Sequence, residues 1–125
     1  MTASALSPIE DSEFTARSEI DGTRLKLYFW GNADLRAKEH LDTFLGAADT
    51  QAMADHLSEV VVDFRELVFM NSSCLKALVT WLGKVQDRPV GEQYKIRFLK
   101  EPAAHWQMRS LHALVAFAPD IVVVE

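Results

Sequence analysis

The sequence predicts a single α/β domain in which helices pack mainly on one face of a mixed β-sheet. The first observation behind this class is a pair of alternating apolar segments joined by a tight turn, which is typical of a β-hairpin. The second is the regular alternation of helical and strand-like segments after it, which makes the later strands parallel. The expected order is β-β-α-β-α-β-α-β over residues 13–125. Residues 1–12 are small, polar and acidic, and we expect them to form a flexible tail.

The hairpin is predicted over residues 14–30. Asp21-Gly22 favours a two-residue turn, because Gly accepts a positive φ and Asp tolerates it. Segment 31–34 is expected to end the second strand. The apolar faces of the two strands carry Phe14, Ala16, Ser18 and Ile20, then Leu25, Leu27 and Phe29.

Three helices and three more strands follow from apolar periodicity. The second helix is expected to end between Gly83 and Pro89, and Pro102 suits the first turn of the third helix. Strands are expected at residues 60–64, 94–98 and 121–124, and the β-branched run at 60–64 predicts a strand that is covered on both faces. The apolar faces of the three helices carry Leu41, Phe44, Leu45 and Ala48; Leu75, Leu78, Val79 and Leu82; and Met108, Leu111 and Val115.

Composition excludes several classes of protein. The 125 residues carry a net charge of −5, and no basic stripe suggests a nucleic-acid partner. No apolar run approaches the roughly 20 residues that span a bilayer, so membrane insertion is not expected. The chain does not open with a basic, apolar leader, so we expect a cytoplasmic location. Cys74 is the only cysteine, which excludes an internal disulfide.

The sequence contains no strong pattern for a metal, a cofactor or a catalytic centre. The four histidines lack the spacing of a metal-binding pair, and neither a G-x-S-x-G elbow nor a glycine-rich phosphate loop is present. We therefore expect no metal, no cofactor and no enzymatic activity. Cys74 has two interpretations, a packed inert thiol or a redox-sensing thiol with a lowered pKa at the start of a helix.

The start of the second helix is the most distinctive stretch. Asn71 is a favoured N-cap, which places Ser72 and Ser73 in the first turn. A helix N-terminus tolerates an added phosphate, because its free N–H groups and its dipole favour an anion. Serines at this position also serve simply in capping. The residues that gather opposite the apolar face are Ser73, Lys76, Thr80 and Lys84.

The stretch VVVDFRELVFMNSSCLKALVTWL resembles the signature of STAS domains, the family of sulphate transporters and anti-sigma factor antagonists. In that signature an apolar strand ending in Asp leads to Met-Asp-Ser-Ser-Gly-Leu at the start of a helix. Gly31 and Asp34 also match the family's Gly-Glu-Leu-Asp, whereas Asn71 and Cys74 replace an Asp and a Gly. The matching residues of the central motif are Asp63, Leu67, Phe69, Met70, Ser72, Ser73 and Leu75.

The resemblance implies a STAS-like domain over residues 13–125 and a non-catalytic bacterial regulator. Its members most like this chain bind a serine kinase of the anti-sigma type until that kinase phosphorylates the second serine. Carried over, the acceptor is Ser73. The residues expected to contact the partner are Asp34, Asn71, Ser72, Ser73, Lys76 and Thr80.

Two alternatives remain open. The domain could be a constitutive adaptor subunit of a larger assembly, never phosphorylated, which the Asn71 and Cys74 replacements favour. It could instead bind a small ligand or a nucleotide. A homo-oligomer is compatible with either alternative.

Overall fold

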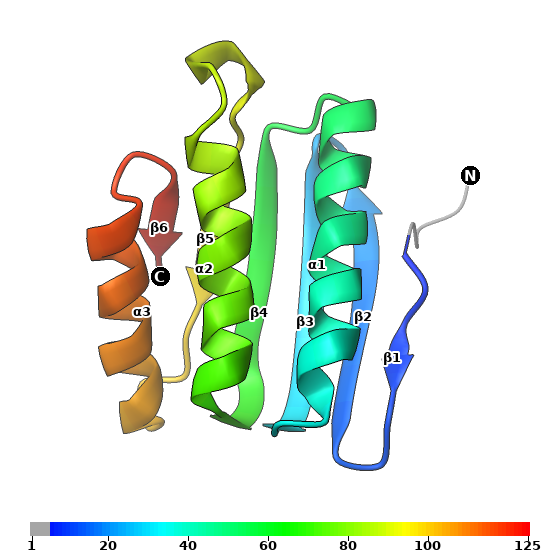
Figure 1. Ribbon diagram of the computed structural model, residues 1–125, viewed down its shortest axis with the longest axis vertical. Helices are drawn as coiled ribbons and strands as arrows, with labels where there is room; N and C mark the ends of the chain where they lie inside the picture. The colour runs from blue at the N-terminus through cyan, green and yellow to red at the C-terminus, as the bar shows by residue number, and fades with distance from the viewer. Residues whose placement is uncertain (1–5) are drawn as a thin grey trace.

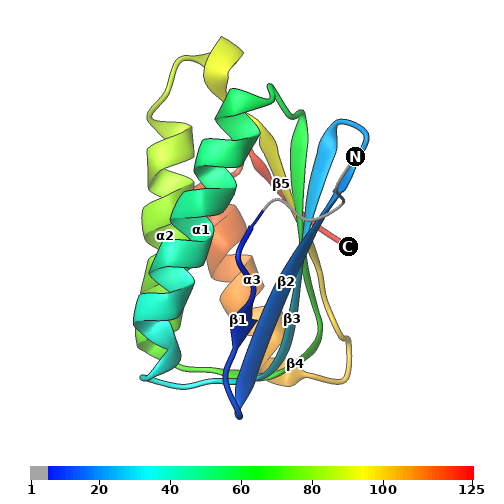
Figure 2. The same cartoon turned by 90° about the vertical axis from the view of Figure 1, so that its right-hand side faces the viewer.

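The computed structural model describes residues 6–125 as a six-stranded sheet with three α-helices on one side of it (Figures 1 and 2). Strands lie in chain order, antiparallel from β1 to β3 and parallel from β3 to β6, so the predicted fold class is confirmed. No helix within these residues is both long and apolar enough to cross a bilayer. The elements are β1 (Ile9–Glu10), β2 (Phe14–Asp21), β3 (Arg24–Ala33), α1 (Ala37–Ala54), β4 (Glu59–Met70), α2 (Ser72–Gln86), a 3₁₀ turn (Val90–Glu92), β5 (Lys95–Leu99), α3 (His105–Phe117) and β6 (Val122–Val124).

The β2–β3 hairpin is confirmed, with Asp21 opposite Arg24 and Gly22 at φ +63° in the turn. The second strand ends within the expected segment 31–34, but it continues through Gly31 and Asn32 to Ala33. Gly31 has φ +88°, and a Cβ there would collide with the carbonyl oxygen of Glu13. Gly31 therefore permits the backbone of β3 to lie close to the backbone of Glu13, just before β2.

The expected tail is wrong for residues 6–12. Ile9 pairs with Ala16, and Glu10 pairs with Thr15, so β1 adds an edge strand to the sheet. Leu6 and Ile9 are buried in the hydrophobic core. The remainder of the predicted tail, residues 1–5, lies outside the described residues.

Strand β4 is much longer than the predicted strand at residues 60–64. It pairs with β3 as far as Met70, but its last partner on β5 faces Asp63. Residues 60–64 are buried on both faces, as expected, although the helices cover only one of these faces (Figure 2). On the other face, long polar side chains from neighbouring strands bury Val61.

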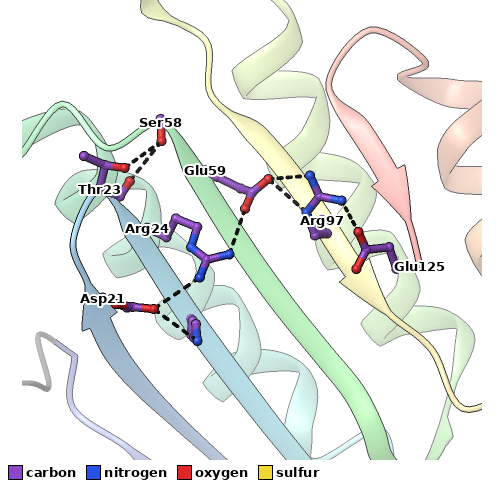
Figure 3. Close-up of polar contacts among 8 residues, drawn as sticks. Asp21, Thr23, Arg24, Ser58, Glu59, Arg97 and Glu125 are labelled. Carbon is purple, nitrogen blue, oxygen red and sulfur yellow. Dashed lines mark hydrogen bonds and ion pairs between the residues drawn. The ribbon is translucent and has the colours of Figure 1, made fainter.

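Charged side chains on the open face form a chain of ion pairs across four strands (Figure 3). Glu59 is its centre: it contacts Arg24 at 3.7 Å and Arg97 at 3.0 Å. Arg24 continues to Asp21, and Arg97 continues to Glu125. These pairs cover the sheet with groups that water solvates, which explains why the face needs no helix.

The core lies between the sheet and the helices, and the predicted faces of α1 and α2 point into it. The prediction for α3 is partly wrong. Pro102 precedes the helix, which begins at His105, and Met108 is 54% exposed. Gln107 takes the expected place of Met108 and is fully buried. The largest fully buried side chains include Phe29, Phe64, Phe98, Leu41, Leu78, Leu82 and Leu111.

A buried polar network joins α1 and α2 to the segment that precedes β5, near the C-terminal end of α2. Asp49 accepts two hydrogen bonds from Arg88, at 2.8 and 2.6 Å, and one from the Tyr94 hydroxyl at 2.7 Å. That hydroxyl in turn accepts a bond from Nε1 of Trp81 at 2.8 Å. Burial opposes ionisation of Asp49, but the bonds from Arg88 and Tyr94 outweigh it and lower the pKa of this carboxyl.

Candidate functional site

The site is the start of α2, where the sequence predicts the helix to begin. The Asn71 side chain accepts a hydrogen bond from the backbone N–H of Cys74 at 3.1 Å, so the predicted N-cap is confirmed. The backbone N–H of Asn71 donates to the carbonyl oxygen of Ala33 at 2.9 Å. The ends of β3 and β4 therefore lie side by side where α2 begins.

Ser72 and Ser73 both lie in the first turn of α2, as expected. Ser72 is exposed and Ser73 is partly exposed. The N–H groups of a first turn have no partner within the helix, so they are free to stabilise an anion. A phosphate on Ser73 would stand at this positive helix end, one turn from the exposed Lys76.

The Asp34 loop is held against the same turn. The Asp34 side chain accepts a bond from the backbone N–H of Arg36 at 3.0 Å, which closes a local turn. The Asp34 carbonyl oxygen accepts a bond from the Cys74 thiol at 3.4 Å, over 40 positions in the sequence. The structure therefore brings Asp34 together with Asn71, Ser72 and Ser73.

Thr80 lies apart from this group. It is exposed on α2, about 12 Å along the helix axis from Ser72. It borders a small hollow between α1 and α2, which Asp42, Gly46 and Lys84 also line. Thr80 would meet a partner only if the contact extended two turns along α2.

Cys74 is packed, not exposed. Its side chain is fully buried, and burial together with the nearby carboxylates of Asp34 and Asp42 raises the pKa of the thiol to about 11. The thiol is therefore protonated near neutral pH. The redox-sensor interpretation of Cys74 is wrong, and the packed interpretation is confirmed.

Sequence patterns missed the apolar rim of this site. Leu35 is 68% exposed, Val68 is 66% exposed and Phe69 is 46% exposed. Leu35 follows Asp34, and Phe69 precedes the Asn71 cap by two positions, so both residues adjoin the site along the chain. The apolar run at residues 67–70, which follows Arg65 and Glu66, was the available signal, but it could equally have belonged to the core. Exposed apolar side chains grouped beside polar ones mark interaction sites more often than isolated ones do.

No metal centre is found in the part of the chain that the structure describes, since no three His, Cys, Asp or Glu side chains lie close enough to hold an ion. The four histidines, His40, His56, His105 and His112, are all exposed.

Comparison with known proteins supports the fold. No protein-family model and no curated protein sequence matches the chain. Among solved structures, an anti-sigma factor antagonist from Mycobacterium paratuberculosis superposes with a TM-score of 0.65 at 18% identity. The match covers 89% of this chain and 86% of that chain. This chain therefore shares the fold of that protein, and the predicted STAS-like fold is confirmed.

Proposed function

We propose that this chain is a non-catalytic regulatory protein that binds a protein partner through the start of α2. The docking surface consists of Asp34, Leu35, Phe69, Asn71, Ser72 and Ser73, and Lys76 and Thr80 extend it along the helix. The observation that carries the proposal is the partly exposed Ser73 in a capped first turn, beside a loop and two exposed apolar side chains.

The chemistry of the surface suits a docking contact that a phosphate can switch. Leu35 and Phe69 offer apolar area, which favours association when it is buried. Phosphorylation of Ser73 would add about two negative charges and their hydration shell at the centre of that contact. The helix N-terminus would tolerate the charge, so the effect would fall on the partner and not on the fold.

The proposed partner is a serine kinase of the anti-sigma type. The solved neighbour is named as an anti-sigma factor antagonist, and the serine pair of this chain occupies the position that the family motif gives to the acceptor. Transcription regulation in a bacterial cytoplasm is the corresponding role. Asn71 keeps the cap that the motif's Asp would supply, and the Cys74 side chain points into the core and not toward a partner.

Phosphate mapping tests the proposal. The protein would be incubated with ATP and the anti-sigma-type serine kinases of its own genome, and phosphate would be located by mass spectrometry. We expect label on Ser73, its loss in Ser73→Ala, and its retention in the matched variant Ser72→Ala. Ser73→Asp should weaken binding to the same kinase at least tenfold, about 1.4 kcal/mol.

The constitutive adaptor remains a second candidate, because the exposed apolar rim can bind a partner whether or not Ser73 is modified. Its expected result is a stable complex that forms equally well with wild type, Ser73→Ala and Ser73→Asp. If Ser73 also carries no phosphate after incubation with the kinases, the phosphorylation switch is contradicted and the adaptor function is supported.

A further inference from the structure

The second half of β4, residues 64–70, has strand partners on one side only. Its neighbour β5 ends at Leu99, which faces Asp63. On the other side β4 pairs with β3 in a shifted register, because β4 has one extra residue between Asp63 and Glu66 and another between Leu67 and Phe69. The backbone groups on the side of β5 must therefore find other partners, or remain buried without one.

Two side chains of α3 supply those partners. Nε2 of Gln107 donates to the carbonyl oxygen of Phe64 at 2.7 Å and to that of Leu67 at 3.1 Å. Nε1 of Trp106 donates to the carbonyl oxygen of Val68 at 2.8 Å. The first turn of α3 thus takes the place of a neighbouring strand along the irregular part of β4.

Gln107 is built into this position. The residue is fully buried, both of its amide hydrogens are used, and its oxygen accepts a bond from the backbone N–H of Glu101 at 2.8 Å. An apolar side chain of the same size would fill the space equally well. It would leave two buried carbonyl groups and the partly buried N–H of Glu101 without these bonds, and each buried group left unpaired costs about 1–3 kcal/mol.

The segment that Gln107 holds leads directly to the docking surface. Phe69 and Asn71 follow Leu67 within four positions, and on the other side Asn71 is bonded to Ala33. We infer that Gln107, assisted by Trp106, is a positioning residue for the docking surface: it sets where β4 places Phe69 and the capped start of α2. Its link to docking rests on the proposed function, whereas its effect on the start of α2 does not.

Cys74 provides a local probe of this positioning. It is the chain's only cysteine, it is fully buried in the first turn of α2, and it is bonded to the Asp34 loop. A thiol reagent such as Ellman's reagent can react with it only when this end of the molecule opens. The labelling rate of native protein therefore measures opening at the docking surface.

The test compares Gln107→Met with Tyr94→Phe. Gln107→Met keeps a long, unbranched side chain and removes all three bonds. Tyr94→Phe weakens the buried network near the C-terminal end of α2 and leaves the start of α2 intact. Each variant would be compared with wild type at urea concentrations that give equal free energies of unfolding. We expect Gln107→Met to label about tenfold faster or more, and Tyr94→Phe to label at the wild-type rate.

Equal labelling of the two variants at matched stability would overturn the inference, because Gln107 would then contribute only to global stability. If Gln107→Met does not fold, Trp106→Phe removes a single bond to Val68 and should still accelerate labelling, by about threefold. An unchanged rate in that variant would also overturn the inference.

The link to docking has its own readout. Gln107→Met should be phosphorylated on Ser73 more slowly than Tyr94→Phe, and normal phosphorylation with faster labelling would overturn that link. The labelling assay uses no partner. If wild type itself is never phosphorylated and binds no kinase, the proposed function fails, while labelling still decides whether Gln107 positions the start of α2.

Discussion

At the scale of single residues, two neighbours in the first turn of α2 have opposite environments. Ser73 is partly exposed, whereas Cys74 is fully buried with its thiol on the Asp34 carbonyl oxygen. Successive helical residues differ by about 100°, so one turns toward solvent and the next turns toward the core. The cap at Asn71 fixes this phase, because it determines where the helix begins.

The cap can be tested by substitution. Asn71→Ala removes the bond to the Cys74 N–H and should lower the free energy of unfolding by about 1 kcal/mol. Asn71→Asp is the matched control, because its carboxylate can accept the same bond and should keep most of the stability. Urea denaturation followed by circular dichroism measures both. An equal loss in the two variants would mean that the side-chain oxygen is not what stabilises this end.

At the scale of elements, glycines at two positions serve different ends. Gly31 in β3 has a positive φ and no room for a Cβ beside Glu13. Gly46 lies within α1, and nothing lies within 4 Å of the place where its Cβ would stand. Position 31 requires glycine because the backbone of Glu13 lies too close for a Cβ atom. Position 46 does not require glycine, because a Cβ atom there would meet no neighbour.

Alanine at each position should therefore change stability in opposite directions. Gly31→Ala should lower the free energy of unfolding by about 2 kcal/mol or more, because a strained φ and a collision with backbone combine. Gly46→Ala should raise it by about 1 kcal/mol, because alanine has the higher helix propensity. Thermal denaturation of the two variants beside wild type checks the pair. A loss of stability in Gly46→Ala would show that an added methyl group cannot be accommodated in the hollow between α1 and α2.

At the scale of the whole molecule, Asp49 connects the helical layer to the sheet. Its bonds to Arg88 and Tyr94 span 39 and 45 positions of sequence. The pKa of this carboxyl is lowered in the folded state, so the folded protein binds the proton less readily than the unfolded chain does. The carboxylate of Asp49 therefore stabilises the folded state fully at pH values above the pKa that it has in the unfolded chain, about 4. This stabilisation is lost as pH falls through the lower pKa of the folded state.

A pH series tests this network. Asp49→Asn should lower the free energy of unfolding by about 3 kcal/mol at pH 7, since it leaves a half-buried guanidinium without its partner. The difference from wild type should begin to shrink below about pH 4, where the unfolded chain takes up the proton, and should disappear as pH falls through the lower folded pKa. Asp120→Asn, at an exposed position, is the control and should differ little from wild type at pH 7. Urea denaturation at pH 7, 5 and 3 measures all three proteins, and a constant difference for Asp49→Asn would contradict the titration.

Local patterns were sufficient for much of the fold. Alternation at residues 14–30 predicted the hairpin, and the 3.6-residue period predicted the buried faces of α1 and α2. The cap at Asn71 follows from the type of one side chain and its place before an apolar period. These features depend on neighbours within a few positions, so they can be read from the chain alone. Ser73 is also partly exposed, as its place opposite the apolar face of the helix predicted.

Only the tertiary structure decided which distant groups satisfy one another. Burial of Gln107 was not predicted, because a polar residue on an amphipathic helix is normally exposed, and its two partners on β4 lie 40 or more positions away. The length of β4 and the Asp49–Arg88 pair were missed for the same reason, whereas the β1 edge strand was missed because its two residues are too few to show an alternating pattern. Periodicity reports which side of an element is apolar. It does not report which backbone group or charge, far along the chain, will need a partner once the layers close.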